Sequence, residues 1–161
     1  MKNKVSLNSR VSLWEIILSV LIFAAAGIIM LNCFAIARFT QIRANDKAIA
    51  GAIIQSDFEI IKSFSSTDEI YEFLNPYKTK ESGVINTYTK YYDKNWIQGS
   101  GNEYAVTIMI DLERSSSGEM VNINIFAEKE KPYPFIKTGG QQIYSIESKK
   151  FFPFFGGKYG E

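Results

Sequence analysis

The feature that most constrains this chain of 161 residues is an uncharged apolar run of 22 residues, from Ile16 to Ala37. About 20 helical residues are needed to cross the hydrocarbon core of a bilayer. A helix buried in a soluble core would normally keep a polar face, but Ser19 and Asn32 are the only clearly polar members of this run. The run therefore predicts a single membrane-spanning helix.

The rest of the composition excludes several classes of function. The chain has 18 basic and 17 acidic residues, so its net charge gives no reason to expect a nucleic-acid partner. It has no histidine, which is the commonest general base and metal ligand. Its single cysteine, Cys33, lies inside the apolar run. We therefore predict no catalytic residue, no cofactor and no metal, and we do not expect an enzyme.

A basic leader precedes the run, and an acid stands at its start. Residues 1–10 contain Lys2, Lys4 and Arg10, and Glu15 comes immediately before the uncharged segment. A carboxylate near a helix N-terminus, at the level of the lipid headgroups, costs little free energy. The acid alone is therefore weak evidence, and its value comes from its distance to the leader.

This arrangement resembles the N-terminal segment of type IV prepilins and pseudopilins. In that family a peptidase cuts the leader after a glycine, usually before a phenylalanine, and the fifth residue of the mature chain is an acid. The resemblance places the cut between Arg10 and Val11 and makes Glu15 the fifth residue. Arg10 stands where the family has glycine, and Val11 stands where it usually has phenylalanine.

The resemblance implies a structural role without catalysis. It implies a minor pilin or pseudopilin of a type IV pilus, a type II secretion system or a DNA-uptake filament. Glu15 would then pair with the free, methylated amino terminus of a neighbouring subunit. The expected partners are other pilin-like subunits, the lipid bilayer and a prepilin peptidase.

Two other readings of the N-terminal region stay open. Because Arg10 replaces the glycine, the chain could be an uncleaved, single-pass anchor for an extracytoplasmic binding module. Cleavage after Ala37 would instead release a secreted domain, since Ala35-Ile36-Ala37 has the small-x-small form of a signal cleavage site. The apolar run is longer than the 7–15 residues usual in a secretory signal, which disfavours this reading.

The flanking charges give little information on orientation. Three basic residues precede the run and three follow it closely, so the positive-inside rule does not decide. The free amino terminus tips the balance towards a cytoplasmic N-terminus and an extracytoplasmic C-terminal head.

The helical period continues beyond the membrane segment. Residues 38–64 contain one glycine and no proline, and their apolar residues recur at helical spacing. The members of this stripe are Ile42, Ala48, Ile49, Ile53, Ile54, Ile60, Ile61 and Phe64. We therefore expect a membrane helix over 11–37, an amphipathic continuation over 38–64 and a head over 65–161.

The head begins with a short helix and then changes to an alternating pattern. Ser66 and Glu69 have the spacing of a capping box, and Asn75-Pro76 ends the helix. Strands are predicted over 84–92, 103–114, 119–128 and, at an edge of the sheet, 143–152. The predicted fold class is α+β: a long N-terminal helix packed on a small antiparallel sheet of three or four strands, as in pilins.

Two aromatic groups allow more than one interpretation. The first can stack on sugars or bases, but packing in the core is favoured; it comprises Tyr88, Tyr91, Tyr92 and Trp96. The second is either an exposed contact patch or a tail folded on the head; it comprises Phe151, Phe152, Phe154 and Phe155. The alternating charges of Glu128 to Lys131 predict a solvated strand end.

Overall fold

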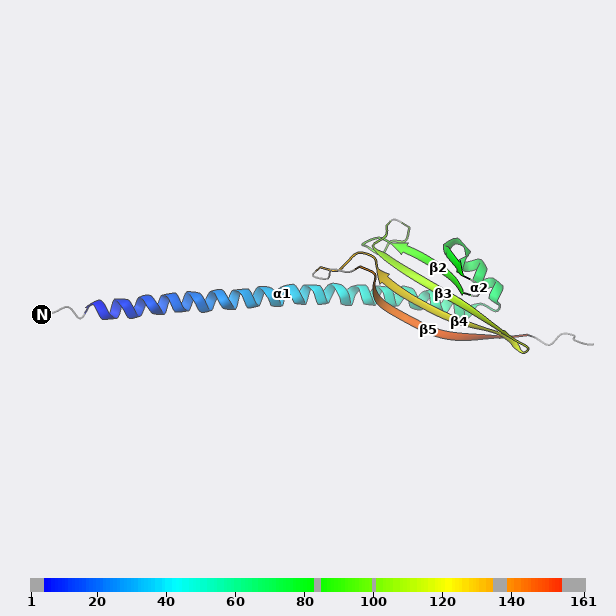
Figure 1. The fold of residues 1–161 in the computed structure, drawn as a ribbon, viewed down its shortest axis with the longest axis horizontal. Helices are drawn as coiled ribbons and strands as arrows, with labels where there is room; N and C mark the ends of the chain where they lie inside the picture. The colour runs from blue at the N-terminus through cyan, green and yellow to red at the C-terminus, as the bar shows by residue number, and fades with distance from the viewer. Residues whose placement is uncertain (1–4, 83–84, 100, 135–138, 155–161) are drawn as a thin grey trace, which may run out of the picture. The chain divides into compact units, whose positions relative to one another are not determined.

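The computed structural model describes residues 5–82, 85–99, 101–134 and 139–154, with side chains described outside 5–12 and 80–82. The chain divides into two units, Met1–Ile42 and Arg43–Glu161. Helix α1, Val5–Ser63, runs through both of them. The second unit adds helix α2, a short 3-10 helix and five strands (Figure 1).

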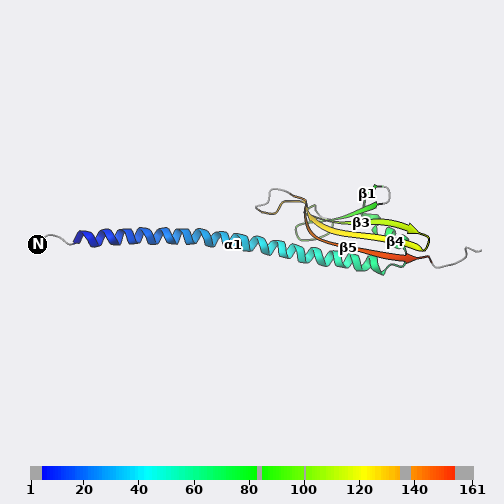
Figure 2. The same cartoon turned by 60° about the horizontal axis from the view of Figure 1, so that its bottom comes forward.

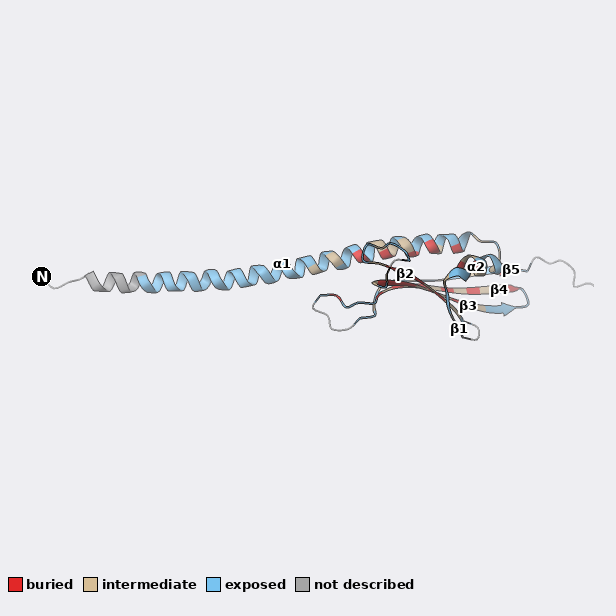
Figure 3. Cartoon of the chain, turned by 90° about the horizontal axis from the view of Figure 1, so that it is seen from above, coloured by how far each residue is buried: buried red, intermediate tan, exposed pale blue. Residues whose placement is uncertain are grey.

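The first unit is helical from Val5 onwards, so the helix begins ahead of the membrane segment that we expected to start at Val11. The sequence explains this, because Val5 to Arg10 contains neither proline nor glycine to end a helix. From Leu13 to Arg38 every residue is exposed, and Figure 3 shows this part of the helix as pale blue ribbon. Residues 1–4 of the predicted leader lie outside the described residues.

In the second unit, α1 turns a narrow face towards the sheet. Its buried residues follow steps of four, four, three and four, and they are Asp46, Ala50, Ile54, Asp57 and Ile61. The predicted stripe was right at Ile54 and Ile61 but wrong at Ala48 and Ile60, which are exposed. The two aspartates explain the difference, because a search for apolar periodicity counts them as solvent-facing.

The helix predicted after the long helix is confirmed. Helix α2 spans Thr67–Leu74, and the Ser66 side chain accepts a hydrogen bond of 3.3 Å from the Glu69 amide. The Glu69 side chain reaches back one residue beyond the cap, where its Oε2 accepts a hydrogen bond of 2.8 Å from the Ser65 amide. The 3-10 helix η1, Asn75–Tyr77, follows directly, with its proline in the first turn.

The sheet is an antiparallel meander in the order β1-β2-β3-β4-β5 (Figures 1 and 2). Its strands are β1 Lys78–Ser82, β2 Ile85–Tyr92, β3 Tyr104–Ser115, β4 Gly118–Lys129 and β5 Gln141–Pro153. The α+β fold is therefore confirmed, and β5 lies at an edge as predicted. The strand that we missed is β1, whose sequence KTKES contains no apolar residue to reveal an alternating pattern.

The β3–β4 hairpin supplies the centre of the core. Its register places Ile108 opposite Ile125 and closes the turn at Ser115 and Gly118. A side chain at Gly118 would collide with the backbone oxygen of Phe152 at 2.3 Å, so the turn requires glycine here. The inward residues of both strands match the prediction: Tyr104, Val106, Ile108, Ile110, Val121, Ile123, Ile125 and Ala127.

The aromatic groups divide between the core and the surface. Tyr88 and Tyr92 are buried, as the packing interpretation favoured, whereas Tyr91 keeps 44% of its surface exposed. Near the end of β5, Phe152 is buried while Phe151 and Phe154 are exposed. Phe155 lies outside the described residues.

The predicted solvated strand end is wrong at one position. Lys129, inside the charged segment 128–131, is buried because its register on β4 places it on the inward face beside Tyr104. The alternating charges hid this, since a lysine at a strand end normally reaches water.

Candidate functional site

Glu15, the residue predicted to guide assembly, lies on the exposed surface of α1. Its backbone oxygen accepts a hydrogen bond of 2.8 Å from Ser19 Oγ, one helical turn later. This bond satisfies the serine hydroxyl inside the apolar segment, where water would not be available. Among the residues whose side chains are described, none forms an ion pair with the Glu15 carboxylate.

The predicted processing position lies within the helix. Arg10 and Val11 both have α-helical backbones, and their side chains lie outside the described residues. Proteases cut most readily where the backbone is not held in regular hydrogen-bonded structure. A peptidase acting between these two residues would therefore have to open the helix locally.

The helix of the first unit exposes apolar side chains on all sides. Fifteen large apolar residues between Leu13 and Ile36 are each at least half exposed. Moving one such side chain out of water is favourable by about 1.5–3 kcal/mol. For the whole group, leaving water for an apolar environment would therefore be favourable by roughly 20–45 kcal/mol. An apolar stretch of 18 residues in this helix has a mean hydropathy of 2.6, and none of its residues is buried. By length and composition this helix can cross a membrane.

A buried ion pair joins α1 to the sheet within the second unit. Lys90 Nζ donates a hydrogen bond of 2.8 Å to Asp57 Oδ1, and both side chains are at least nine-tenths buried. The same ammonium lies 4.9 Å from the centre of the Tyr77 ring and 5.5 Å from that of Phe73. Burial, with a smaller contribution from the Asp57 charge, raises the pKa of Tyr92 to about 12.

A second polar link lies where residues after β4 meet α1. The Tyr133 hydroxyl donates a hydrogen bond of 2.8 Å to the buried Asp46 Oδ2. Burial, and then the hydrogen bond to Asp46, raise the pKa of the Tyr133 hydroxyl. Arg43 lies over the Tyr133 ring at 5.7 Å, so this tyrosine is held by both a carboxylate and a cation.

Lys129 extends this link to the start of β3. Its Nζ donates to the Tyr104 hydroxyl and to Glu103 Oε1, both at 2.9 Å. Glu103 also accepts an ion pair of 2.8 Å from Lys131 through its other oxygen. The hydrogen bond from Lys131, followed by that from Lys129, lowers the pKa of the Glu103 carboxyl. The buried charges of the head therefore act as ties between elements.

The sequence contained two signs of these ties. Asp46 and Asp57 are eleven residues apart, which is close to three helical turns and places them on one face. Lys90 falls between Tyr88 and Tyr92 in the inward register of β2. Asp57 on the inward face of α1 and Lys90 on the inward face of β2 have opposite charges, which indicates that the two side chains contact each other.

The described residues contain no group of three or more His, Cys, Asp or Glu side chains that could hold a metal ion. Comparison of the chain with protein-family models, with curated proteins and with solved structures gave no match.

Proposed function

We propose that this protein is a pilin-like structural subunit, anchored in the membrane by α1 with its N-terminus in the cytoplasm and its head outside. It serves as a minor subunit of a type IV pilus, a type II secretion system or a DNA-uptake filament. One observation carries the proposal: an uncharged membrane-length helix begins beside Glu15 and continues into a segment that packs on an antiparallel sheet.

The chemistry of Glu15 supports assembly. A carboxylate moved from the lipid headgroup level into a bundle of apolar helices loses its hydration, and an unpaired buried charge costs several kcal/mol. A neighbouring cation at matching height offsets this cost only when the two subunits are in register. Processing would create such a cation as the amino group of Val11, and subunits shifted along the bundle would leave Glu15 unpaired.

The head fits a structural role. Its buried carboxylates Asp46 and Asp57 are engaged by Tyr133 and Lys90, so they serve cohesion rather than proton transfer. The proposal accordingly assigns the head no catalytic activity.

A second candidate is an uncleaved, membrane-anchored binding module with the same topology. Two observations favour it: Arg10 stands where the prepilin family has glycine, and the backbone of Arg10 and Val11 is helical. In this case no new amino terminus forms, and Glu15 would pair with a basic side chain or stay at the headgroup level.

The intact mass and N-terminal sequence of the chain, purified from its native membrane, test the proposal. A start at Val11, with a methylated amine, supports the filament subunit. A start at Met1 supports the anchored module and contradicts prepilin-type processing. A start at Arg38 contradicts both, because the apolar segment would then be a discarded signal.

A further inference from the structure

A cleft of about 570 Å³ opens at the edge of the sheet, where β1 no longer covers β2. Within the described residues, the pairing of β1 with β2 ends at Lys78 and Tyr88. Beyond that point the wall of the cleft comes from η1, from β2, from the loop after β2 and from the residue that follows β4. Its main side chains are Tyr77, Thr89, Tyr91, Gln98, Asn102 and Glu130.

The backbone of β2 presents hydrogen-bonding groups to this cleft. The Tyr92 oxygen faces β3, where it accepts from the Glu103 amide, and the Tyr91 oxygen faces the opposite side, where it accepts from the Gly99 amide. Neighbouring carbonyls alternate in direction along a strand. The C=O group of Thr89 and the N–H group of Tyr91 therefore point to the same edge as the Tyr91 oxygen, whereas the N–H of Thr89 belongs to the last pair of β1 with β2.

Neutral polar side chains surround that edge. In the described part of the chain, the side chains of Thr89, Gln98 and Asn102 make no hydrogen bond to another protein group. The cleft also contains Lys90, but its ammonium is engaged by Asp57 at 2.8 Å. Glu130 is the remaining charge among the described lining residues, so these residues offer no free cation to an anionic ligand.

One aromatic ring beside the cleft is available for stacking. Tyr91 is 44% exposed and lies on the face of the sheet opposite the buried Tyr92. The C–H face of a pyranose ring can pack against such a ring while its hydroxyls reach the surrounding amides. Each sugar hydroxyl both donates and accepts, which suits the mixed donors and acceptors of amide side chains and of an open strand edge.

The loop that forms one wall is held in a defined conformation. Asp93 Oδ1 accepts hydrogen bonds of 2.8 Å from the amides of Asn95 and Ile97. Trp96 has a left-handed backbone, with φ of 62°, and its ring stacks on Tyr104 at 4.0 Å. A left-handed conformation is strained for a bulky residue and persists only where its surroundings impose it. Residues 93–97, which lead into this wall, are therefore organised before any ligand binds.

We propose that this cleft binds a neutral saccharide. The free neutral donors and acceptors, the exposed tyrosine ring and the engaged lysine fit a polyhydroxylated, uncharged ligand. An extended peptide fits less well, because only the Thr89 carbonyl and the Tyr91 N–H of this edge are left open, and so short an edge offers few ladder bonds. The site belongs to the head alone, so it applies equally to a filament subunit and to an anchored module.

Binding can be measured with the full chain in lipid nanodiscs, since the headgroups of sugar-based detergents would compete for the cleft. The probes are chitotriose, cellotriose and maltotriose, with sialyllactose as an anionic saccharide and an extended hexapeptide as the peptide probe. We expect saturable binding of at least one neutral trisaccharide at millimolar concentration, measured by calorimetry. No binding of any neutral probe, or tighter binding of the anionic or peptide probe, would overturn the proposal.

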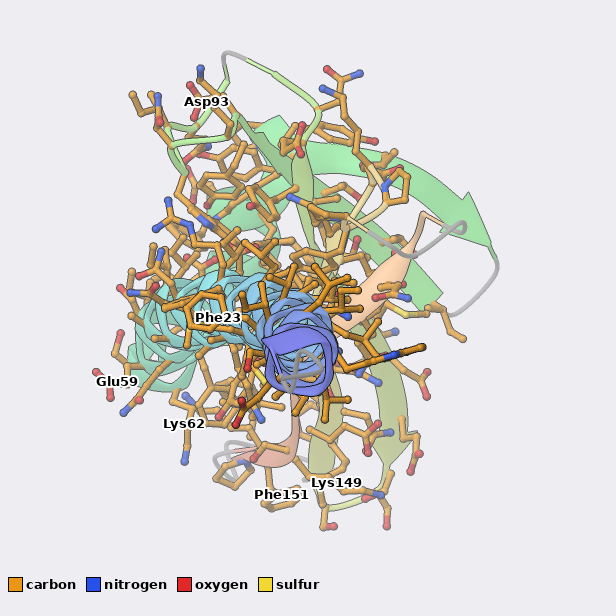
Figure 4. The ribbon with its side chains drawn as sticks, turned by 90° about the vertical axis from the view of Figure 1, so that its left-hand side faces the viewer. Phe23, Glu59, Lys62, Asp93, Lys149 and Phe151 are labelled. Carbon is orange, nitrogen blue, oxygen red and sulfur yellow. The ribbon has the colours of Figure 1, made fainter. Side chains whose placement is uncertain are left out.

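Two substitutions locate the site. Tyr91→Ala and Asn102→Ala should each weaken binding by about tenfold or more, whereas Tyr91→Phe, which keeps the ring, should weaken it less than Tyr91→Ala. Phe151→Ala is the matched control, because Phe151 is also 44% exposed and lies far from Asp93 in Figure 4. Equal affinity of the wild type and both alanine variants at the cleft would place the saccharide elsewhere and overturn the assignment.

Discussion

Lys90 on β2 and Asp57 on α1, 33 residues apart in the chain, form a buried ion pair with 2.8 Å between Nζ and Oδ1. The other carboxylate oxygen, Asp57 Oδ2, is buried without a hydrogen-bond partner among the described residues. The pair therefore fixes where the helix lies on the sheet, but it does not satisfy every polar atom that it buries. Removing one partner and removing both should have different consequences.

The substitution Lys90→Met should lower the free energy of unfolding of the head by about 3–5 kcal/mol, because it leaves the Asp57 carboxylate buried and uncompensated. The double variant Asp57→Leu/Lys90→Met should lose much less, since it removes the desolvated charges together. Urea unfolding of the full chain in nanodiscs, followed by near-ultraviolet circular dichroism, measures both. A pair with an exposed arginine provides the control: Arg114→Met should cost about 0–1 kcal/mol, because Arg114 is exposed and Glu119 keeps its hydrogen bond from Thr67. Equal losses in all three variants would contradict a specific role for the buried pair.

Glu103 should make the head sensitive to acid. Its two lysine partners lower the pKa of its carboxyl below the ordinary 4.5, so the folded state binds this proton less readily than the unfolded state. The stabilisation is complete at pH values above 4.5 and is lost as the pH falls through the folded-state pKa. Unfolding curves at a series of pH values should show a steeper acid loss for the wild type than for Glu103→Gln. The same slope in both proteins would assign the acid loss to other groups.

Membrane insertion should tolerate one charge in the apolar run but not two. Its twelve Leu, Ile, Val and Phe residues contribute roughly 4–7 kcal/mol to insertion, and each central arginine costs about 2.5–3.5 kcal/mol. We therefore expect Ala26→Arg to insert and Ala24→Arg/Ala26→Arg to fail, as measured by resistance to carbonate extraction. Ala48→Arg/Ala52→Arg is the matched control, because both alanines are exposed on the part of α1 beyond the run. Extraction of the control as well would indicate misfolding rather than failed insertion.

Replacing Glu15 by glutamine should leave membrane insertion intact and abolish incorporation into a filament. Glutamine keeps the size of the side chain but cannot pair as an anion with a neighbouring cation. Co-purification with the other subunits measures incorporation. Glu59→Gln is the control, because Glu59 is an exposed acid on the same helix whose side chain points outward in Figure 4. Unchanged incorporation of the Glu15 variant would favour the anchored module.

Much of the fold could be predicted because its strongest patterns are local. The helix over the uncharged run, the N-cap at Ser66 and the alternation along β3 and β4 each follow from neighbouring residues, and each was confirmed. Strand β1 was missed because backbone hydrogen bonds to β2 hold it at the edge of the sheet. Such bonds need no apolar side chains, and KTKES contains none.

The polar ties of the head were harder to predict because they depend on residues far apart in the chain. Asp46 and Tyr133 are 87 positions apart in the chain, and no local sequence pattern predicts a contact between them. We predicted Lys129 to be solvent-exposed because its partner Glu103 is 26 positions away in the chain. The prepilin-type role of Arg10, Val11 and Glu15 stays a prediction, since it concerns a peptidase and neighbouring subunits.

The meander also determines the order in which the head can form. Every strand pairs with the strand before it, so the contacts within the sheet close short loops and have low contact order. In the proposed topology the N-terminus stays in the cytoplasm and the head emerges from its N-terminal side, so strands can be added one at a time as they emerge. The contacts from α1 to β2 and to Tyr133 close longer loops, and α1 is already present when they form. The part of α1 beyond the apolar run thus provides the surface on which the sheet can fold.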